Sequence, residues 1–259
     1  MGEIKNKHKM LVVSHKRHFI KKVKYKIINA LFGTYKRNWN TRKTIYAFLK
    51  RIIGFCMALC GIILLLPIMI IVAIAIKCDS KGPIIFKQKR TGKNGKIFKV
   101  WKFRTMYVDN DVRDFSKADK HTKVGTFLRK TSLDEIPQFF NILFGQMAFI
   151  GPRPWIPEYY KFMSDEQRQR AHVLPGITGL AQAKGRNNID IFKKINYDLE
   201  YIDNYSLKED IKVIFLTIKT VLSKDGADAG KSTIKNELDA LKTNSNKLVN
   251  VAKVAKSDI

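Results

Sequence analysis

Cysteine is scarce in this chain, which has three cysteines among its 259 residues. Two of them, Cys56 and Cys60, lie inside an apolar run, where a thiol behaves as a small hydrophobic side chain. Three cysteines do not build a disulfide framework, and no grouping of cysteines with histidines has the spacing of a zinc site. The sequence therefore excludes a disulfide-rich scaffold and a zinc site of cysteine and histidine.

Acidic residues are also few, because 22 Asp and Glu stand against 49 Lys and Arg. The formal net charge of +27 requires an acidic partner, either a nucleic acid, an anionic lipid surface or a phosphorylated substrate. A nucleic-acid-binding protein is one interpretation, since aromatic residues such as Trp101 and Phe103 are interleaved with cations. The hydrophobic content of 45% is high enough for a folded core.

One long apolar run stands out against this basic background. From Ile52 to Ile76 the chain has 25 residues without a charge, more than the roughly 20 that a membrane-spanning helix needs. A mostly basic segment precedes the run, unlike the start of a cleaved signal peptide, so we expect the run to be retained in a membrane. This expectation argues against the nucleic-acid interpretation.

The charges on both sides of the run predict its topology. Residues 1–51 carry 15 Lys and Arg against the single acid Glu3, and lysines follow the run at once. The positive-inside rule assigns both flanks to the cytoplasm, and Pro67 removes a helical hydrogen bond near the middle of the run. We therefore predict a re-entrant helix hairpin within residues 41–80, broken at Pro67. A kinked helix that spans the membrane is the alternative.

Three further segments complete the predicted organisation. Residues 1–40 form a basic arm, suited either to anionic headgroups or to solvent, and residues 81–225 form the main domain. Residues 226–259 form a polar tail, for which a helix is one of two interpretations. Apolar residues from Ile234 to Ile259 follow a weak heptad spacing, which is typical of an oligomerising helix and makes a homodimer possible. A frayed tail is the favoured interpretation.

Within the main domain, the pattern predicts a β-hairpin followed by helices. Apolar and aromatic stretches bracket Asn94-Gly95, a strong hairpin signal. Punctuation by proline and glycine makes Gly151-Pro152-Arg153-Pro154 a fixed loop. The fold class is α+β and mostly helical. The expected strands cover residues 84–90 and 97–104, and the expected helices cover Leu133 to Phe144 and residues 155–170, 189–204 and 207–223.

Two acidic or glycine-rich patterns offer other chemistry. The segment Gly226 to Ser232 looks like a phosphate-binding loop, but only three residues separate its glycines and no strand precedes it, so we reject it. Asp109 and Asp111 could hold the metal of a glycosyltransferase that releases UDP, and this alternative stays open. A calcium-binding EF-hand is excluded, because Lys120 stands where that loop needs glutamate.

The segment Ser132-Leu133-Asp134-Glu135 has two interpretations. Ser and Glu three residues apart predict a capping box, and acids are favourable in a first helical turn. Arg129 lies just upstream, and a helix N-terminus with basic neighbours is an anion site. Adjacent carboxylates beside arginines indicate a site that holds a divalent metal and a phosphate together, with a carboxylate as ligand or nucleophile.

Six motifs, in the same order along the chain, match the pattern of a known family. The chain resembles the bacterial sugar transferase family, the monotopic polyprenyl-phosphate phosphoglycosyl transferases that start glycan assembly on a lipid carrier. The resemblance covers about residues 45–225. Its motifs are Gly82 to Gly92, Lys102-Phe103-Arg104-Thr105-Met106, Arg129 with Ser132 to Glu135, Gly151 to Pro154, Pro175 to Gln182, and Gly185-Arg186-Asn187.

The resemblance implies a two-step exchange at the bacterial inner membrane, with the main domain as a catalytic domain that faces the cytoplasm. Asp134 would attack the β-phosphate of a UDP-sugar and release UMP, and Glu135 would hold Mg²⁺. A membrane polyprenyl phosphate would then accept the phosphosugar. The implied partners are these two substrates and an anionic membrane surface, with no nucleic acid. Arginines implied to bind phosphate are Arg90, Arg104, Arg129 and Arg153, and further implied site residues are Gly151, Pro152, Pro154, Gln182, Arg186 and Asn187.

Overall fold

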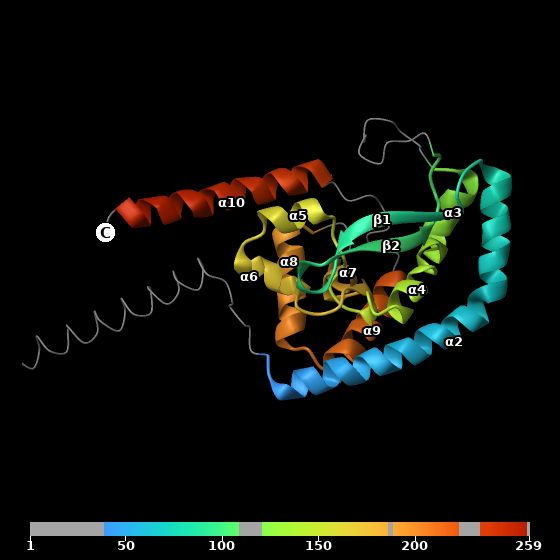
Figure 1. Ribbon diagram of the computed structural model, residues 1–259, viewed down its shortest axis with the longest axis horizontal. Coiled ribbons are helices and arrows are strands. Elements are labelled where there is room, and N and C mark those ends of the chain that lie inside the picture. Colours follow the sequence, from blue (N-terminus) through green and yellow to red (C-terminus); the bar gives the residue numbers. More distant parts are fainter. Residues whose placement is uncertain (1–38, 109–120, 186–188, 223–233, 258–259) are drawn as a thin grey trace, which may run out of the picture. The chain divides into compact units, whose positions relative to one another are not determined.

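The computed structural model describes residues 39–108, 121–185, 189–222 and 234–257, and side chains up to residue 246. These residues are mostly helical and include a small antiparallel hairpin, which confirms the predicted α+β class (Figure 1). The described α-helices are α2 (Thr41–Asp79), α3 (Lys123–Thr131), α4 (Gln138–Leu143), α5 (Pro157–Phe162), α6 (Asp165–Arg168), α7 (Leu180–Gly185), α8 (Ile191–Asp203), α9 (Leu207–Leu222) and α10 (Ile234–Ser257). The strands are β1 (Ile85–Thr91), β2 (Ile97–Phe103), β3 (Ala148–Ile150) and β4 (Gly176–Thr178), and the 3-10 turns are η1 (Lys93–Gly95), η2 (Leu133–Glu135) and η3 (Gln169–Ala171).

Helix α2 contains the whole apolar run. The side chain of Asn40 caps its first turn by accepting a hydrogen bond from the Lys43 N–H, and extended backbone at Ser80 ends it. Pro67 lies inside the helix, and Figure 1 shows that α2 changes direction in its second half. A proline in a helix interior both removes a hydrogen bond and clashes with the preceding turn, so we attribute the bend to Pro67. The helix bends there but does not end.

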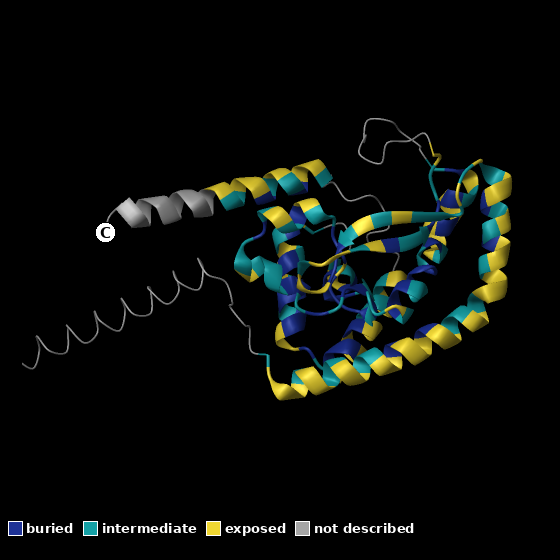
Figure 2. Ribbon diagram, viewed as in Figure 1, coloured by how far each residue is buried: buried dark blue, intermediate teal, exposed yellow. Residues whose placement is uncertain are grey.

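One narrow face of α2 packs on the rest of the chain. Gly54, Ala58, Val72 and Ile76 are buried, while most other apolar side chains of the helix are exposed, as the yellow outer side of α2 in Figure 2 shows. The helix is long enough and apolar enough to cross a membrane. Such a broad exposed apolar surface is typical of a segment that faces lipid.

The hairpin of β1 and β2 has the predicted turn. The strands are antiparallel, with Gln88 opposite Val100. Asn94 and Gly95 both have positive φ angles, of 55° and 77°. These angles match a turn with two left-handed residues, which is the reason that Asn-Gly favours it. The local sequence therefore determines the hairpin and its register.

The predicted helix from Leu133 to Phe144 is wrong in its first half. Leu133–Glu135 forms a 3-10 turn, and α4 begins only at Gln138, after Pro137. The predicted capping box is also wrong, because the Ser132 side chain makes no cap hydrogen bond. Ser132 instead has a left-handed backbone with φ of 57° and ends α3. The sharp reversal between α3 and η2 requires this conformation.

A parallel pair of short strands, β3 and β4, was not predicted. Ala148 pairs with Gly176 and Ile150 with Thr178, and the crossover between them contains α5, α6 and η3. Strands of three residues are too short for a period-2 pattern to be visible in the sequence. The pair fixes the end of β3, where the predicted Gly151 to Pro154 loop begins.

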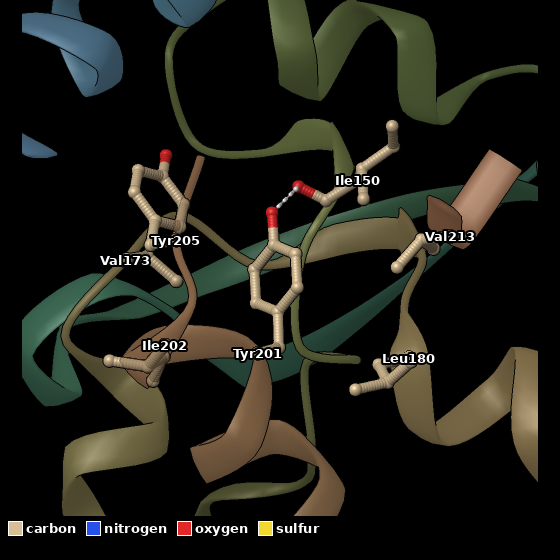
Figure 3. Close-up of a cluster of buried hydrophobic side chains, with 7 residues drawn as sticks. All are labelled: Ile150, Val173, Leu180, Tyr201, Ile202, Tyr205 and Val213. Carbon is tan, nitrogen blue, oxygen red and sulfur yellow. Dashed lines mark hydrogen bonds between the residues drawn. The ribbon is translucent and has the colours of Figure 1, made fainter. Parts of the chain in front are cut away.

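The core beside this pair is built from β3, α7, α8 and α9. Figure 3 shows Tyr201 at its centre, with its hydroxyl 3.5 Å from the Ile150 carbonyl oxygen. The same hydroxyl donates a hydrogen bond of 2.6 Å to Asp210 on α9. The helix spans agree with the predicted spans 189–204 and 207–223 within two residues. The buried members are Ile150, Val173, Leu180, Tyr201, Ile202, Tyr205 and Val213.

Helix α9, like α2, has an exposed apolar face, and this face was not predicted from the sequence. Its members lie three or four residues apart and therefore form one stripe along the helix. Lys208, Lys212 and Lys219 are exposed on the same helix. The stripe consists of Leu207, Ile211, Ile214, Phe215, Ile218, Val221 and Leu222.

The favoured interpretation of the tail as frayed is wrong for Ile234–Ser257, which form helix α10. Helix α10 packs on α5, and Leu241 is fully buried in a cluster with Trp155 and Tyr159. Glu237 accepts hydrogen bonds of 2.7 Å from the Tyr159 hydroxyl and from Lys194 Nζ. The apolar spacing from Ile234 to Leu241 therefore serves packing within the chain, and the homodimer stays a prediction.

Candidate active site

The side chain of one lysine contacts two adjacent carboxylates. Asp134 and Glu135 lie in η2, and Lys102 reaches them from β2. Lys102 Nζ lies 3.6 Å from Asp134 Oδ2 and donates a hydrogen bond to Glu135 Oε1. Alternation along the strand places Lys102 on the same face of the hairpin as Val100. A single ammonium group therefore neutralises part of the charge of both carboxylates.

The pKa values of the two carboxyl groups shift in opposite directions. Asp134 is 8% exposed, and burial raises its pKa more than the attraction of Lys102 lowers it. Burial would also raise the pKa of Glu135, but Arg153 and Lys102 together outweigh it and lower that pKa to about 2. Glu135 is therefore a fixed anion at neutral pH, whereas Asp134 is the more basic carboxylate. A more basic carboxylate is the better nucleophile of the two.

Arg153 brings a second cation to Glu135. Its Nη2 lies 3.3 Å from Glu135 Oε1, and its side chain is 45% exposed. A guanidinium group has five N–H donors in a planar fork. The contact with Glu135 therefore leaves donors of Arg153 available to a ligand.

The loop that carries Arg153 is held by the parallel strand pair. The Gly151 N–H donates to the Thr178 carbonyl oxygen at 2.9 Å, and the Pro152 carbonyl oxygen accepts from the Gly176 N–H at 3.1 Å. A Cβ atom at Gly151 would lie 2.5 Å from the Leu174 carbonyl oxygen, so only glycine fits. The loop is fixed, as the sequence predicts.

A buried ion pair lies behind the same loop. Arg170 donates hydrogen bonds of 2.8 and 2.6 Å to Asp198 Oδ2, and another of 2.8 Å to the Arg153 carbonyl oxygen. The Arg170 guanidinium carbon also lies 3.8 Å from the centroid of the Trp155 ring. Both members of the pair are almost completely buried. Arg170 therefore positions the backbone of Arg153.

A cavity opens beside the carboxylates. Three cations line it: Arg90, Lys102 and Arg153. Arg90 donates to Gln88 Oε1 and, at 3.4 Å, to the Pro154 carbonyl oxygen. Burial lowers the pKa of Arg90 to about 10, and the positive charge of Arg153 acts in the same direction. The remaining lining residues are Phe86, Gln88, Val100, Gln138 and Pro154.

Arg129 lies close to the carboxylates but has its own partner. Its Nη1 lies 2.8 Å from His121 Nε2, and its charge lowers the pKa of Asp134. The Nδ1 atom of His121 lies 3.2 Å from the Thr105 carbonyl oxygen. Arg129 therefore contributes to the field at Asp134 from the helix that precedes the turn.

Two residues assigned to the site by resemblance lie in other parts of the fold. Arg104 is buried and donates to the backbone carbonyls of Ile76 and Ser80, so it caps the end of α2. Gln182 donates to the Ile177 carbonyl oxygen at 2.8 Å and thereby fixes the turn after β4. Arg186 and Asn187 lie outside the described residues, as do Asp109 and Asp111.

Sequence reasoning missed four residues of the site. Lys102 begins the motif Lys102-Phe103-Arg104-Thr105-Met106, and the alternation of side chains along β2 could have indicated its orientation. Gln138 follows the acid pair by one helical turn. Arg170 and Asp198 are 28 residues apart and gave no local signal, because only packing brings them together.

The carboxylates fit one mode of Mg²⁺ binding. Mg²⁺ is usually held by one or two carboxylates, with waters and substrate phosphates completing its octahedron. Asp134 and Glu135 supply that small set, and within the described ranges no group of three or more His, Cys, Asp or Glu residues could enclose a metal. The donor set therefore suits an ion that binds together with a phosphorylated ligand.

Comparison with known proteins defines the class to which this fold and site belong. Residues 45–224 match the bacterial sugar transferase family, and the chain belongs to that family. It is 50% identical over 169 residues to the UDP-glucose:undecaprenyl-phosphate glucose-1-phosphate transferase of Klebsiella pneumoniae, which covers 61% of this chain and 36% of that protein. It is 37% identical over 207 residues to the undecaprenyl-phosphate galactose phosphotransferase of Salmonella typhimurium, which covers 73% of this chain and 43% of that protein.

A third relative is matched over more of its own length. An uncharacterized sugar transferase of Bacillus subtilis is 42% identical over 147 residues, which are 56% of this chain and 73% of that protein. This chain spans about two fifths of the length of the Klebsiella and Salmonella proteins. The matched part includes the carboxylate turn and the Arg153 loop.

Proposed function

We propose that this protein transfers a sugar-1-phosphate from a UDP-sugar to a membrane polyprenyl phosphate and releases UMP. The observation that carries the proposal is the contact of Lys102 with both Asp134 and Glu135, beside a cavity lined by three cations. Such a site matches a substrate with two phosphates, because cations offset its charge while a carboxylate reacts with it. The names of the Klebsiella and Salmonella relatives support the same substrate classes.

In the first step, the Asp134 carboxylate attacks the β-phosphorus of the UDP-sugar. An O–P bond forms between Asp134 and the phosphosugar, and the bond between the β-phosphorus and the bridging oxygen breaks, so UMP leaves with that oxygen. In the second step, a phosphate oxygen of the polyprenyl phosphate attacks the same phosphorus and the Asp134 carboxylate is regenerated. The raised pKa of Asp134 supports its assignment as the nucleophile.

The other side chains bind and orient the phosphates. Arg153 and Arg90 offer guanidinium donors, and Lys102 holds the orientation of both carboxylates. Glu135 would hold Mg²⁺, which when bound offsets the pyrophosphate charge and makes UMP a better leaving group. Arg129 contributes positive charge near Asp134.

The nucleotide product tests the function directly. We expect purified protein, supplied with Mg²⁺, polyprenyl phosphate and a panel of UDP-sugars, to release UMP with at least one donor. Release of UDP would instead indicate a glycosyltransferase that moves the sugar without its phosphate. Release of neither nucleotide, together with tight, salt-dependent binding of RNA or DNA, would support the nucleic-acid interpretation.

Lys102 should control the pH dependence of the first step. Because its positive charge lowers the pKa of Asp134, Lys102→Met is expected to raise that pKa further. The nucleophile must be ionised, so the acidic limb of UMP release should move to higher pH. Measuring UMP in a single turnover without polyprenyl phosphate removes the ionisation of the acceptor from the profile.

The matched control is Lys99→Met on the same strand. Lys99 is exposed and points to the opposite face of the hairpin, so its replacement should leave the acidic limb in place. An unchanged limb in Lys102→Met would contradict the assignment of Asp134 as the group that titrates.

We also propose that α2 is re-entrant, so that both of its ends face the cytoplasm. Lys50, before the bend, donates to the Tyr201 hydroxyl at 2.6 Å, and Val72 and Ile76, after it, pack against Phe103. A straight helix of 39 residues would be roughly 58 Å long. If such a helix crossed the bilayer, its two ends would lie on opposite sides of the membrane, and one small domain could not contact both. The exposed apolar face of α2 then enters the inner leaflet.

The stripe on α9 supports a further contact with an anionic membrane surface. It combines exposed apolar side chains with three exposed lysines, a composition that suits a helix lying in the headgroup region. Each cation near an anionic surface contributes about 1 kcal/mol. This contact supports our proposal that the catalytic domain lies on the cytoplasmic face of the bacterial inner membrane.

Accessibility labelling tests the topology of α2. In a background without Cys56, Cys60 and Cys78, we would place single cysteines by Ile45→Cys and Lys81→Cys. Both positions are exposed and flank the helix bend. A membrane-impermeant maleimide should label neither in intact spheroplasts and both in inverted vesicles. Opposite labelling of the two positions would establish a full span.

A further inference from the structure

Helix α4 has two buried amide side chains one turn apart, and their surroundings differ. Asn141 accepts a hydrogen bond from the Trp101 N–H and donates to the Lys99 carbonyl oxygen and to Gln146 Oε1. Gln138 is only 3% exposed, yet no hydrogen bond joins its carboxamide to any residue that the structure describes. Asn141 is therefore explained by the fold, and Gln138 is not.

The nitrogen and oxygen of the Gln138 carboxamide are not among the completely buried unpaired polar atoms of the described residues, so they remain accessible from the cavity. Gln138 lines the cavity beside the carboxylates, together with Lys102 and Arg153. Both of these cations contact Glu135, which precedes Gln138 by three residues. The carboxamide is thus available to a ligand close to the reacting end of the site.

We propose that the Gln138 carboxamide hydrogen-bonds a hydroxyl group of the sugar that is transferred, and so helps to determine which UDP-sugar is used. This inference rests on the proposed function. It adds a residue that determines sugar specificity to a site whose cations bind phosphate groups.

The chemistry of the cavity favours a hydroxyl over the other parts of the donor. The cations Arg90, Lys102 and Arg153 match phosphate oxygens, which only accept hydrogen bonds and would leave the Gln138 carbonyl oxygen unpaired. A hydroxyl both donates and accepts, as does a carboxamide. The uracil base lies two phosphates and a ribose away from the sugar, whereas Gln138 lies one turn from the carboxylates.

The test pairs Gln138→Leu with deoxy analogues of the donor. The donor is UDP-glucose or UDP-galactose, whichever the unmodified protein turns over faster, and each analogue lacks one sugar hydroxyl. Leucine keeps much of the volume and helix propensity of glutamine but removes both polar groups. We expect Gln138→Leu to lose about 10- to 100-fold in kcat/KM with the full donor. With one analogue, which lacks the partner hydroxyl, the loss should shrink to about two-fold or less.

Two outcomes would overturn the inference while leaving the proposed function intact. One is an equal loss with every analogue, which would indicate contact with phosphate or uridine. The other is a structural role of Gln138, which would appear as a lowered Tm of Gln138→Leu in thermal unfolding. Asn141→Leu is the reference variant for this measurement. Asn141→Leu should lower Tm because it leaves backbone groups unpaired, whereas Gln138→Leu should not. Failure of the unmodified protein to release UMP would instead contradict the proposed function itself.

Discussion

Asp134→Asn should release no measurable UMP, a loss on the order of 10³-fold or more, because an amide is not a nucleophile toward phosphorus. The change keeps the size of the side chain and removes only its charge. Because burial already disfavours the charged form of Asp134, the variant should fold as stably as the unmodified protein. The measurement is UMP formation with and without polyprenyl phosphate.

A control and a chemical trap complete this experiment. Asp239→Asn changes an exposed carboxylate on α10, which lies outside the site, and should leave UMP release unchanged. With a radiolabelled sugar donor and no acceptor, the unmodified protein should retain label after acid quenching, and Asp134→Asn should not. Full activity in Asp134→Asn would rule out the covalent intermediate.

The Arg170–Asp198 pair is expected to give the largest effect on stability. Arg170→Met leaves Asp198 as a buried charge without its partner, which costs about 3–5 kcal/mol in the free energy of unfolding. Replacing both residues, by Arg170→Met and Asp198→Leu, should recover most of that loss, because apolar side chains of similar volume pack well in place of a buried ion pair. Denaturant unfolding in detergent measures both variants.

Activity should not return with stability in the double variant. Arg170 donates to the Arg153 carbonyl oxygen, and no apolar residue at position 170 can replace this hydrogen bond. We therefore expect a stable protein with a raised KM for the UDP-sugar. The matched control is Lys242→Met, which breaks the exposed pair with Asp239 and should change stability by less than about 1 kcal/mol. Full activity in the double variant would show that Arg170 has no role in positioning Arg153.

Structural features that depend on neighbouring residues were predictable from the sequence, whereas features that depend on distant contacts were not. The Asn94-Gly95 hairpin was predictable because both residues favour the positive φ angles of its turn. The capping box at Ser132 was not, because the reversal after α3 imposes a left-handed backbone that a motif of four residues does not report. Helix α10 was mistaken for a frayed tail because Asn244, Ser245 and Asn246 interrupt its apolar spacing, and burial of Leu241 against α5 and α8 stabilises it.

The apolar run from Ile52 to Ile76, the proline within it and the adjacent acids Asp134 and Glu135 are all visible in the sequence alone. These features depend on composition and on near neighbours, which are readable without a fold. The contact of Lys102 with Glu135, 33 residues later, is visible only in the fold. The same is true of Gln138, whose carboxamide has no hydrogen-bond partner among the described residues, whereas that of Asn141 has three. Contacts over such separations arise from the packing of β2, η2 and α4, because no local conformational preference specifies them.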